Sequence, residues 1–198
     1  MSKITSAAAP KAARHSMTTR TLAGCALLAA MSVVLARFVI PMPAVDQRFS
    51  LEAVPIFIAG MLFGPIPGAL VGFSADLVGC LFSGYGYNPL FCVPPILYGL
   101  SAGLFRPLLL KMTTPLTIGL SFLPPVALGS ILYQSATLAY VYGKGAFLPN
   151  FLVKLSTRSV QFAITFVLDV LVVYLLYKSK VFTAVRLWPA AQKTEDKE

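Results

Sequence analysis

The chain has 198 residues, of which 57% are hydrophobic and 12% are charged, and its mean hydropathy is +0.79. Soluble domains carry about 25% charged residues, so this composition argues against a fold in water. The net charge of +9 does not indicate nucleic-acid binding, because the basic residues flank the apolar runs instead of forming one cluster. We therefore expect an all-α integral membrane protein.

Six apolar segments follow one another, at about 21–40, 51–63, 67–82, 90–110, 116–142 and 150–177. Inside 53–143 the only charged residues are Asp76, Arg106 and Lys111. Uncharged runs of this length, well beyond the roughly 18 residues of a spanning candidate, predict several transmembrane helices. The fifth segment contains Pro124 and Pro125, which predict one bent helix. The pattern thus favours six transmembrane helices.

The basic residues at both ends predict the orientation. Four of them precede the first apolar run and five follow the last one, so the positive-inside rule places both termini in the cytoplasm. The apolar run at 21–40 is too long for a typical signal peptide, and we interpret it as a retained helix. We expect a disordered cytoplasmic leader at 1–19, one membrane domain at 20–178 and a basic, polar tail at 179–198.

Asp76 lies inside the apolar stretch "LVGFSADLVGCLFSGYGYNP" (70–89). An ionised carboxylate at membrane depth costs at least a few kcal/mol unless it faces protein or water. Its partner could be structural, such as Arg37 or Arg158, or it could be a ligand. The sequence leaves both possibilities open.

The start of the last apolar segment, "NFLVKLSTRSVQF" (150–162), places Lys154 and Arg158 four residues apart, on one helix face. More charged and aromatic residues are expected on the same outer side of the membrane. Such a set suits a flat, anionic, hydrogen-bonding ligand. The candidate binding residues are Arg37, Arg48, Glu52, Asp76, Tyr85, Tyr87, Asn88, Phe91, Lys154 and Arg158.

Small residues recur every four positions in three places: at Gly60, Gly64, Gly68 and Gly72, at Gly99 and Gly103, and at Ala26 and Ala30. Small residues let helices approach closely in lipid. For the glycines, packing within the chain is the simpler interpretation. The strip at Ala26 and Ala30 fits internal packing and docking to another membrane protein equally well.

Several catalytic motifs are absent. There is no G-x-x-x-x-G-K-S/T nucleotide loop, no H-E-x-x-H and no G-x-S-x-G, and the only histidine is His15. Cys25, Cys80 and Cys92 lack the paired spacing of a metal site or a disulfide framework. We expect no enzyme activity, no cofactor and no metal.

The stretch "RFSLEAVPIFIAGMLFGPIPGALVGFSADLVGCLFSGYGYNPLF" (48–91) resembles the folate-specific S components of energy-coupling factor (ECF) transporters. The similarity includes "LYGLSAGLF" (97–105) and "YGKG" (142–145) and covers most of 20–178. It implies a six-helix S component in a bacterial plasma membrane that binds folate or an analogue from outside. It also implies assembly with a coupling membrane subunit, docked at Ala26 and Ala30, and with two cytoplasmic ATPases.

Two alternatives stay open. The nearer is an S component for another vitamin, such as riboflavin or pantothenate, and the more distant is a self-contained channel or secondary carrier. The segment "KLSTRS" (154–159) is less basic and more hydroxylic than the family pattern. The residues that contact the tail of the ligand are therefore not defined by the resemblance.

Overall fold

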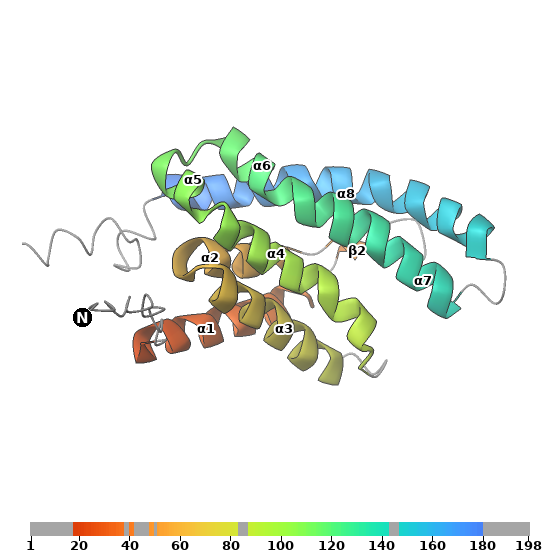
Figure 1. The fold of residues 1–198 in the computed structure, drawn as a ribbon, viewed down its shortest axis with the longest axis horizontal. Coiled ribbons are helices and arrows are strands. Elements are labelled where there is room, and N and C mark those ends of the chain that lie inside the picture. The colour runs from red at the N-terminus through yellow and green to blue at the C-terminus, as the bar shows by residue number, and fades with distance from the viewer. Residues whose placement is uncertain are drawn as a thin grey trace, which may run out of the picture.

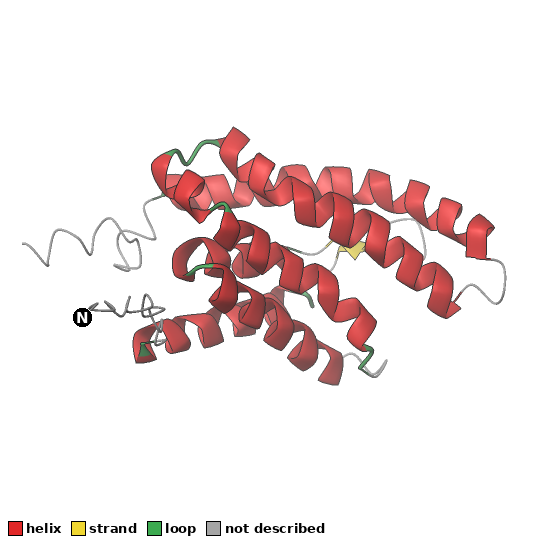
Figure 2. Ribbon diagram, viewed as in Figure 1, coloured by secondary structure: helices red, strands yellow, loops and turns green. Residues whose placement is uncertain are grey.

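The computed structural model describes residues 18–37, 40–41, 48–49, 51–82, 87–142 and 147–179, and these are almost entirely helical (Figures 1 and 2). The α-helices are α1 (Thr19–Leu35), α2 (Ala53–Phe63), α3 (Pro65–Leu81), α4 (Val93–Leu104), α5 (Arg106–Lys111), α6 (Pro115–Pro124), α7 (Gln134–Tyr142) and α8 (Phe147–Lys178). A 3-10 helix, η1 (Pro89–Cys92), precedes α4, and a π-helix, η2 (Pro125–Tyr133), joins α6 to α7. Two-residue strands, β1 (Ile40–Pro41) and β2 (Arg48–Phe49), pair antiparallel, with Ile40 opposite Phe49.

Helix α2 lies at the centre of the molecule. Its sequence, "AVPIFIAGMLF", is apolar on every side, and residues 53–62 are all buried. A helix that is hydrophobic all round belongs in a core. Phe57 of α2 stacks on Phe122 of α6 with 3.9 Å between ring centroids, and Tyr98 of α4 meets Phe122 edge-on. These aromatic contacts join α2 and α4 to α6, which runs beside α8 (Figure 1).

Glycines bring α2, α3 and α4 into backbone contact. A Cβ atom on Gly60 would overlap the carbonyl oxygen of Gly99, and one on Gly99 would overlap the backbone of Gly68. Gly72 and Gly103 are equally tight, against Pro95 and Pro65. Packing within the chain is therefore the role of both glycine ladders, as expected. Gly64, with φ +105°, makes the turn between α2 and α3, where residues with a Cβ are strained.

The single helix predicted over 116–142 is present as one continuous rod made of α6, η2 and α7 (Figure 1). Pro125 has no N–H to bond the carbonyl of Ser121 four residues earlier. The hydroxyl of Ser101, from α4, donates to that carbonyl instead. A serine on a neighbouring helix thus makes a proline tolerable inside a membrane helix.

The expectation of one helix over 90–110 is wrong. The helix is interrupted at Phe105, which lies between the end of α4 and the start of the short helix α5. Arg106 then turns back to α2, and its Nε and Nη2 donate to the carbonyls of Met61 and Leu62 at 3.2 and 3.0 Å. These are among the last carbonyls of α2, which lack partners within their own helix.

Two helical stretches of the described chain are long and apolar enough to cross a membrane, 115–142 and 147–178. Four shorter apolar helices accompany them, at Thr19–Leu35, Ala53–Phe63, Pro65–Leu81 and Pro89–Leu104. Helices of 10–17 residues are shorter than the roughly 20 residues of a straight span. The number of spans therefore stays a prediction. Most of the expected leader and tail, 1–17 and 180–198, lies outside the described residues.

Candidate functional site

A cavity of about 330 Å³ lies between α2, α3, α4, η2 and α8. This volume is at the lower end of the range for small-molecule sites. The residues that line it are Ala36, Glu52, Ala53, Ile56, Asp76, Phe91, Pro94, Pro95, Tyr98, Ser130, Gln134, Arg158, Gln161, Phe162, Thr165 and Asp169.

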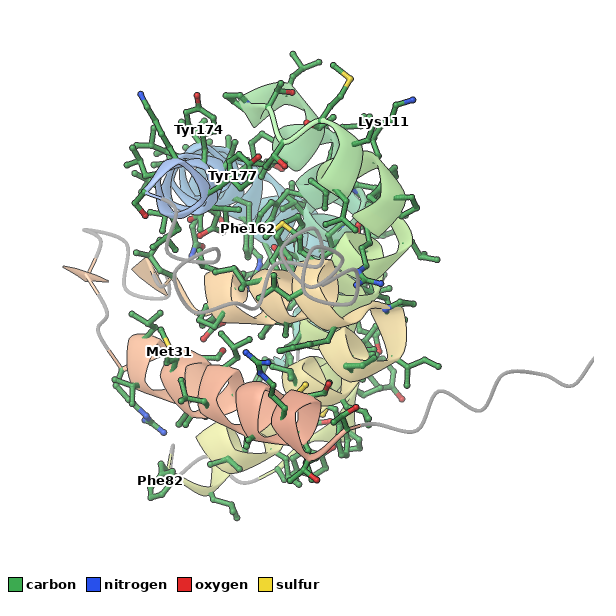
Figure 3. The ribbon with its side chains drawn as sticks, turned by 90° about the vertical axis from the view of Figure 1, so that its left-hand side faces the viewer. Met31, Phe82, Lys111, Phe162, Tyr174 and Tyr177 are labelled. Atoms are coloured by element: carbon green, nitrogen blue, oxygen red, sulfur yellow. The ribbon has the colours of Figure 1, made fainter. Side chains whose placement is uncertain are left out.

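Helix α8 supplies one complete side of the cavity. Its lining residues follow the pattern i, i+3, i+4, i+7 and i+11, and therefore share one helix face. They are Arg158, Gln161, Phe162, Thr165 and Asp169. Phe162 points toward the middle of the molecule in Figure 3. Because a helix rises 1.5 Å per residue, the Cα atoms of Arg158 and Asp169 are about 16 Å apart along the axis. The cavity thus has a cationic end and an acidic end.

The guanidinium of Arg158 lies 5.2 Å from the ring centroid of Phe162, measured from Cζ. This distance is within the range of a cation–π interaction. The contact orients the cation within the cavity. A guanidinium held in this way presents several N–H groups to a carboxylate.

Asp76, from α3, accepts a hydrogen bond of 2.8 Å from the thiol of Cys92. The hydroxyl of Tyr87 lies 2.9 Å from the same sulfur. This hydrogen bond raises the pKa of Tyr87 to about 12. The three side chains form a short chain of hydrogen bonds that joins the end of α3 to η1. Asp76 is therefore held by the thiol of Cys92.

Asp169 is 1% exposed, and its Oδ1 makes no hydrogen bond to any described residue. A buried polar group without a hydrogen bond costs about 1–3 kcal/mol, and more if it is charged. Glu52, at the start of α2, also lines the cavity and is close enough to act electrostatically on Asp169. Tyr98 and Ser130 share a hydrogen bond of 3.0 Å in the same wall. This end of the cavity is rich in acceptors.

The structure brings four of the predicted binding residues to the cavity. They are Glu52, Asp76, Phe91 and Arg158. The side chain of Arg48, and all of Tyr85, fall outside the described part of the molecule.

Four other predicted residues are not among those that line the cavity, and their contact with a ligand stays a prediction. Arg37 donates to the carbonyl of Gly79 at 2.8 Å, near the C-terminus of α3, where a cation is favourable. Asn88 accepts a hydrogen bond from the N–H of Leu90 and caps η1. Tyr87 reaches the lining only through Cys92, and Lys154 lies one turn beyond Arg158.

Sequence reasoning missed several lining residues. Asp169 carried the same signal as Asp76, because it is a carboxylate within the last apolar segment. Tyr98, Ser130, Gln134 and Thr165 carry no such signal, since polar uncharged residues are common in membrane helices. Among the described residues, no group of three or more His, Cys, Asp or Glu side chains could hold a metal ion.

Helix α1 presents its small residues to the outside. Ala26 and Ala30 are both exposed, and Leu27, Met31 and Val34 are exposed beside them. Figure 3 shows Met31 on this helix, at one side of the molecule. The strip does not pack within the described chain, so it is available to lipid or to another protein.

A helical membrane fold around a polar cavity is the architecture of a small-molecule carrier or capture subunit. Residues 16–180 match the family of ECF-type riboflavin transporter S components. The chain belongs to this family, and is therefore a membrane protein of the transporter-component class.

Two solved structures share the fold. The structure of FolT bound with folic acid is 29% identical, with a TM-score of 0.67, and the match covers 80% of this chain and 94% of that one. The S component for biotin from an ECF-type ABC transporter is 19% identical, with a TM-score of 0.55 and coverage of 82% and 95%. At that identity the second match shows the fold alone.

A segment of 64 residues is 36% identical to an uncharacterized protein of Mycoplasma pneumoniae, the MG098 homolog. The match spans 32% of this chain and 13% of that protein. It adds no functional information.

Proposed function

We propose that the protein is the folate-binding S component of an ATP-driven ECF importer, which captures folate or a close analogue from outside the cell. The observation that carries this proposal is the α8 face of the cavity, with Arg158 at one end and Asp169 at the other. The similarity to FolT bound with folic acid supports it.

Folate matches the cavity chemically at both ends. Its pterin ring is flat and carries N–H donors, and its glutamate tail carries two carboxylates. Arg158 is the cation in the lining that can pair with the tail. Phe91 and Phe162 line the cavity and offer aromatic surface to the rings. The carboxylates of Glu52 and Asp76, which are both predicted binding residues, are also in the lining.

Riboflavin is the second candidate, because the matching family model describes riboflavin transporters. Riboflavin has a flat ring with an N–H donor but no carboxylate. It would use the aromatic and acceptor groups of the cavity, and it brings no carboxylate to the guanidinium of Arg158. The position of Arg158 in the lining therefore favours folate.

The experiment that decides between them is titration of the purified full chain, in detergent, with folic acid, riboflavin, biotin and pantothenate. We expect binding of folic acid and no comparable binding of the other three. A response to riboflavin alone would contradict the folate proposal and leave the family assignment intact.

We also propose that the chain crosses the plasma membrane of a bacterium six times, with both termini in the cytoplasm. The two long apolar stretches, the four shorter apolar helices and the basic residues near both ends of the chain support this topology. Labelling of single cysteines placed at residues 3, 46, 144 and 193 in intact cells tests it. Residues 46 and 144 should react with a membrane-impermeant reagent, and residues 3 and 193 should react only after lysis.

We infer that the chain is not an enzyme and that a coupling membrane subunit and two ATPases complete the transporter. The exposed strip at Ala26 and Ala30 supports docking of the coupling subunit there. Liposomes that contain this chain alone should therefore show no folate uptake. Uptake without partners or ATP would favour a self-contained carrier instead.

A further inference from the structure

The two aspartates in the cavity lining differ in their hydrogen bonding. Asp76 accepts a hydrogen bond from the thiol of Cys92. Asp169 is 1% exposed, and its Oδ1 has no hydrogen bond from any residue that the structure describes. A buried acceptor in this state is stabilised by any molecule that brings a donor to it. Of the two carboxyl groups, Asp169 is the one with a buried oxygen that accepts no hydrogen bond from the described residues.

We propose that Asp169 binds the N–H donor edge of the pterin ring, so that the ligand enters head first and lies along α8. This inference rests on the proposed folate function and assigns the pterin edge to a residue that the sequence did not indicate. The 2-amino group and the N3–H of a pterin lie side by side on one edge of the ring. Two parallel N–H donors match the geometry of a carboxyl group.

The charges along α8 favour this direction. Glu52 lies close enough to act on Asp169, so a ligand carboxylate placed at that end would face two acidic side chains. Arg158 lines the cavity eleven residues earlier on α8, about 16 Å away along the helix axis. The glutamate tail therefore belongs at the Arg158 end, and the pterin at the Asp169 end.

The side chains between the two ends fit a ligand that has both aromatic and polar parts along its length. Gln161, Phe162 and Thr165 line the cavity between Arg158 and Asp169. Phe162 is already in contact with the Arg158 guanidinium, so its ring is held near the tail end. One aromatic and two polar side chains thus lie between the two ends, which suits a linker with an aromatic ring and an amide.

A thermodynamic cycle between ligand and protein tests the assignment. The affinities of folic acid and of its 2-desamino analogue are measured for the wild type, Asp169→Asn and Asp76→Asn, using the full chain in detergent. The wild type should bind folic acid about 10- to 100-fold more tightly than the analogue. Asp169→Asn should remove most of this preference. Asp76→Asn changes the other aspartate and should alter both affinities by the same factor.

Three results would overturn the inference. They are equal affinity of the wild type for both ligands, an unchanged preference in Asp169→Asn, and loss of the preference in Asp76→Asn alone. The comparison of the two ligands on the wild type uses no variant, so it is valid even if a substitution prevents folding. Asp169→Ser provides a second variant if Asp169→Asn does not fold. If the wild type binds no folic acid at all, the proposed function itself fails. Folic acid binding with no role for Asp169 would refute this inference alone.

Discussion

The hydroxyl of Ser101 on α4 donates a hydrogen bond to the carbonyl of Ser121 on α6, the carbonyl that Pro125 leaves without a helical partner. Both serines are buried, Ser121 completely. The bond therefore joins two helices at the point where one of them is interrupted. It also explains how two consecutive prolines fit within one long apolar helix.

We expect Ser101→Ala to lower the free energy of unfolding by about 1 kcal/mol, because a buried carbonyl loses its donor. Ser156→Ala is the control, since Ser156 is exposed and bonds only within its own helix. The effect should shrink in a Pro125→Ala background, where residue 125 regains an N–H. Thermal unfolding in detergent is measured for the wild type, the three single variants and the Ser101→Ala/Pro125→Ala double variant. An equal loss in both backgrounds would contradict the link to Pro125.

Gly99→Ala should severely reduce folding, because its Cβ would overlap the backbone of Gly68. Overpacking against backbone atoms, which cannot rotate away, should cost at least about 2 kcal/mol. Gly79→Ala is the matched control, since a Cβ there has no neighbour within 4 Å. Alanine also favours a helix over glycine, so Gly79→Ala should be neutral or slightly stabilising. Yield and melting temperature of the two variants provide the comparison.

Arg106 holds the C-terminal end of α2 through two hydrogen bonds to carbonyl groups. Arg106→Gln should lower stability by about 2 kcal/mol, because those carbonyls lose a charged donor. Arg106→Lys keeps the charge but cannot reproduce the two-point geometry, so it should recover only part of the loss. The control is Lys111→Gln on the same short helix, where the side chain is exposed. Equal unfolding temperatures for the Gln variants would refute this role.

Arg158→Gln should weaken folic acid binding about 10- to 100-fold, because the anionic tail loses its charged partner. Lys178→Gln, at the other end of the same helix, removes the same charge from an exposed position and should leave affinity unchanged. The neutral ligand 6-hydroxymethylpterin has no tail, and its affinity should be the same for the wild type and Arg158→Gln. A parallel loss for both ligands would show that Arg158 acts through the structure of the cavity.

Ala26→Trp should prevent assembly with the coupling subunit while the isolated chain still binds folic acid, because the bulky ring blocks close helix approach. Ala163→Trp is the matched control, since Ala163 is an exposed alanine on α8. Co-purification of the coupling subunit with each variant measures assembly. Equal recovery with both variants would place the docking surface elsewhere.

Much of the fold follows from local signals in the sequence. Proline and glycine at 64–68 predicted the turn between α2 and α3, and the long uncharged run predicted the rod at 115–142. The break at Phe105 was missed, although Arg106 and Pro107 follow it directly. This turn is stabilised by hydrogen bonds between Arg106 and α2, which are distant in the sequence, so the local sequence did not predict it.

The candidate site was only partly predictable, for a similar reason. Charged residues in apolar segments drew attention to Asp76 and Arg158, and both line the cavity. Arg37 carried the same signal but bonds to a helix terminus instead. A charge shows only that some partner exists, and the identity of the partner depends on how distant helices pack.

The π-helix at Pro125–Tyr133 determines which way the rest of its rod faces. Its hydrogen bonds join residues five apart, so it holds more chain per turn than the α-helices on either side. If this stretch wound as an α-helix, each of its nine residues would turn the chain by about 100°, which is more than in a π-helix, and α7 would face a different direction relative to α6. Gln134 would then swing out of the cavity wall. The side chains that α7 presents to the cavity thus depend on how the backbone of the preceding segment is wound.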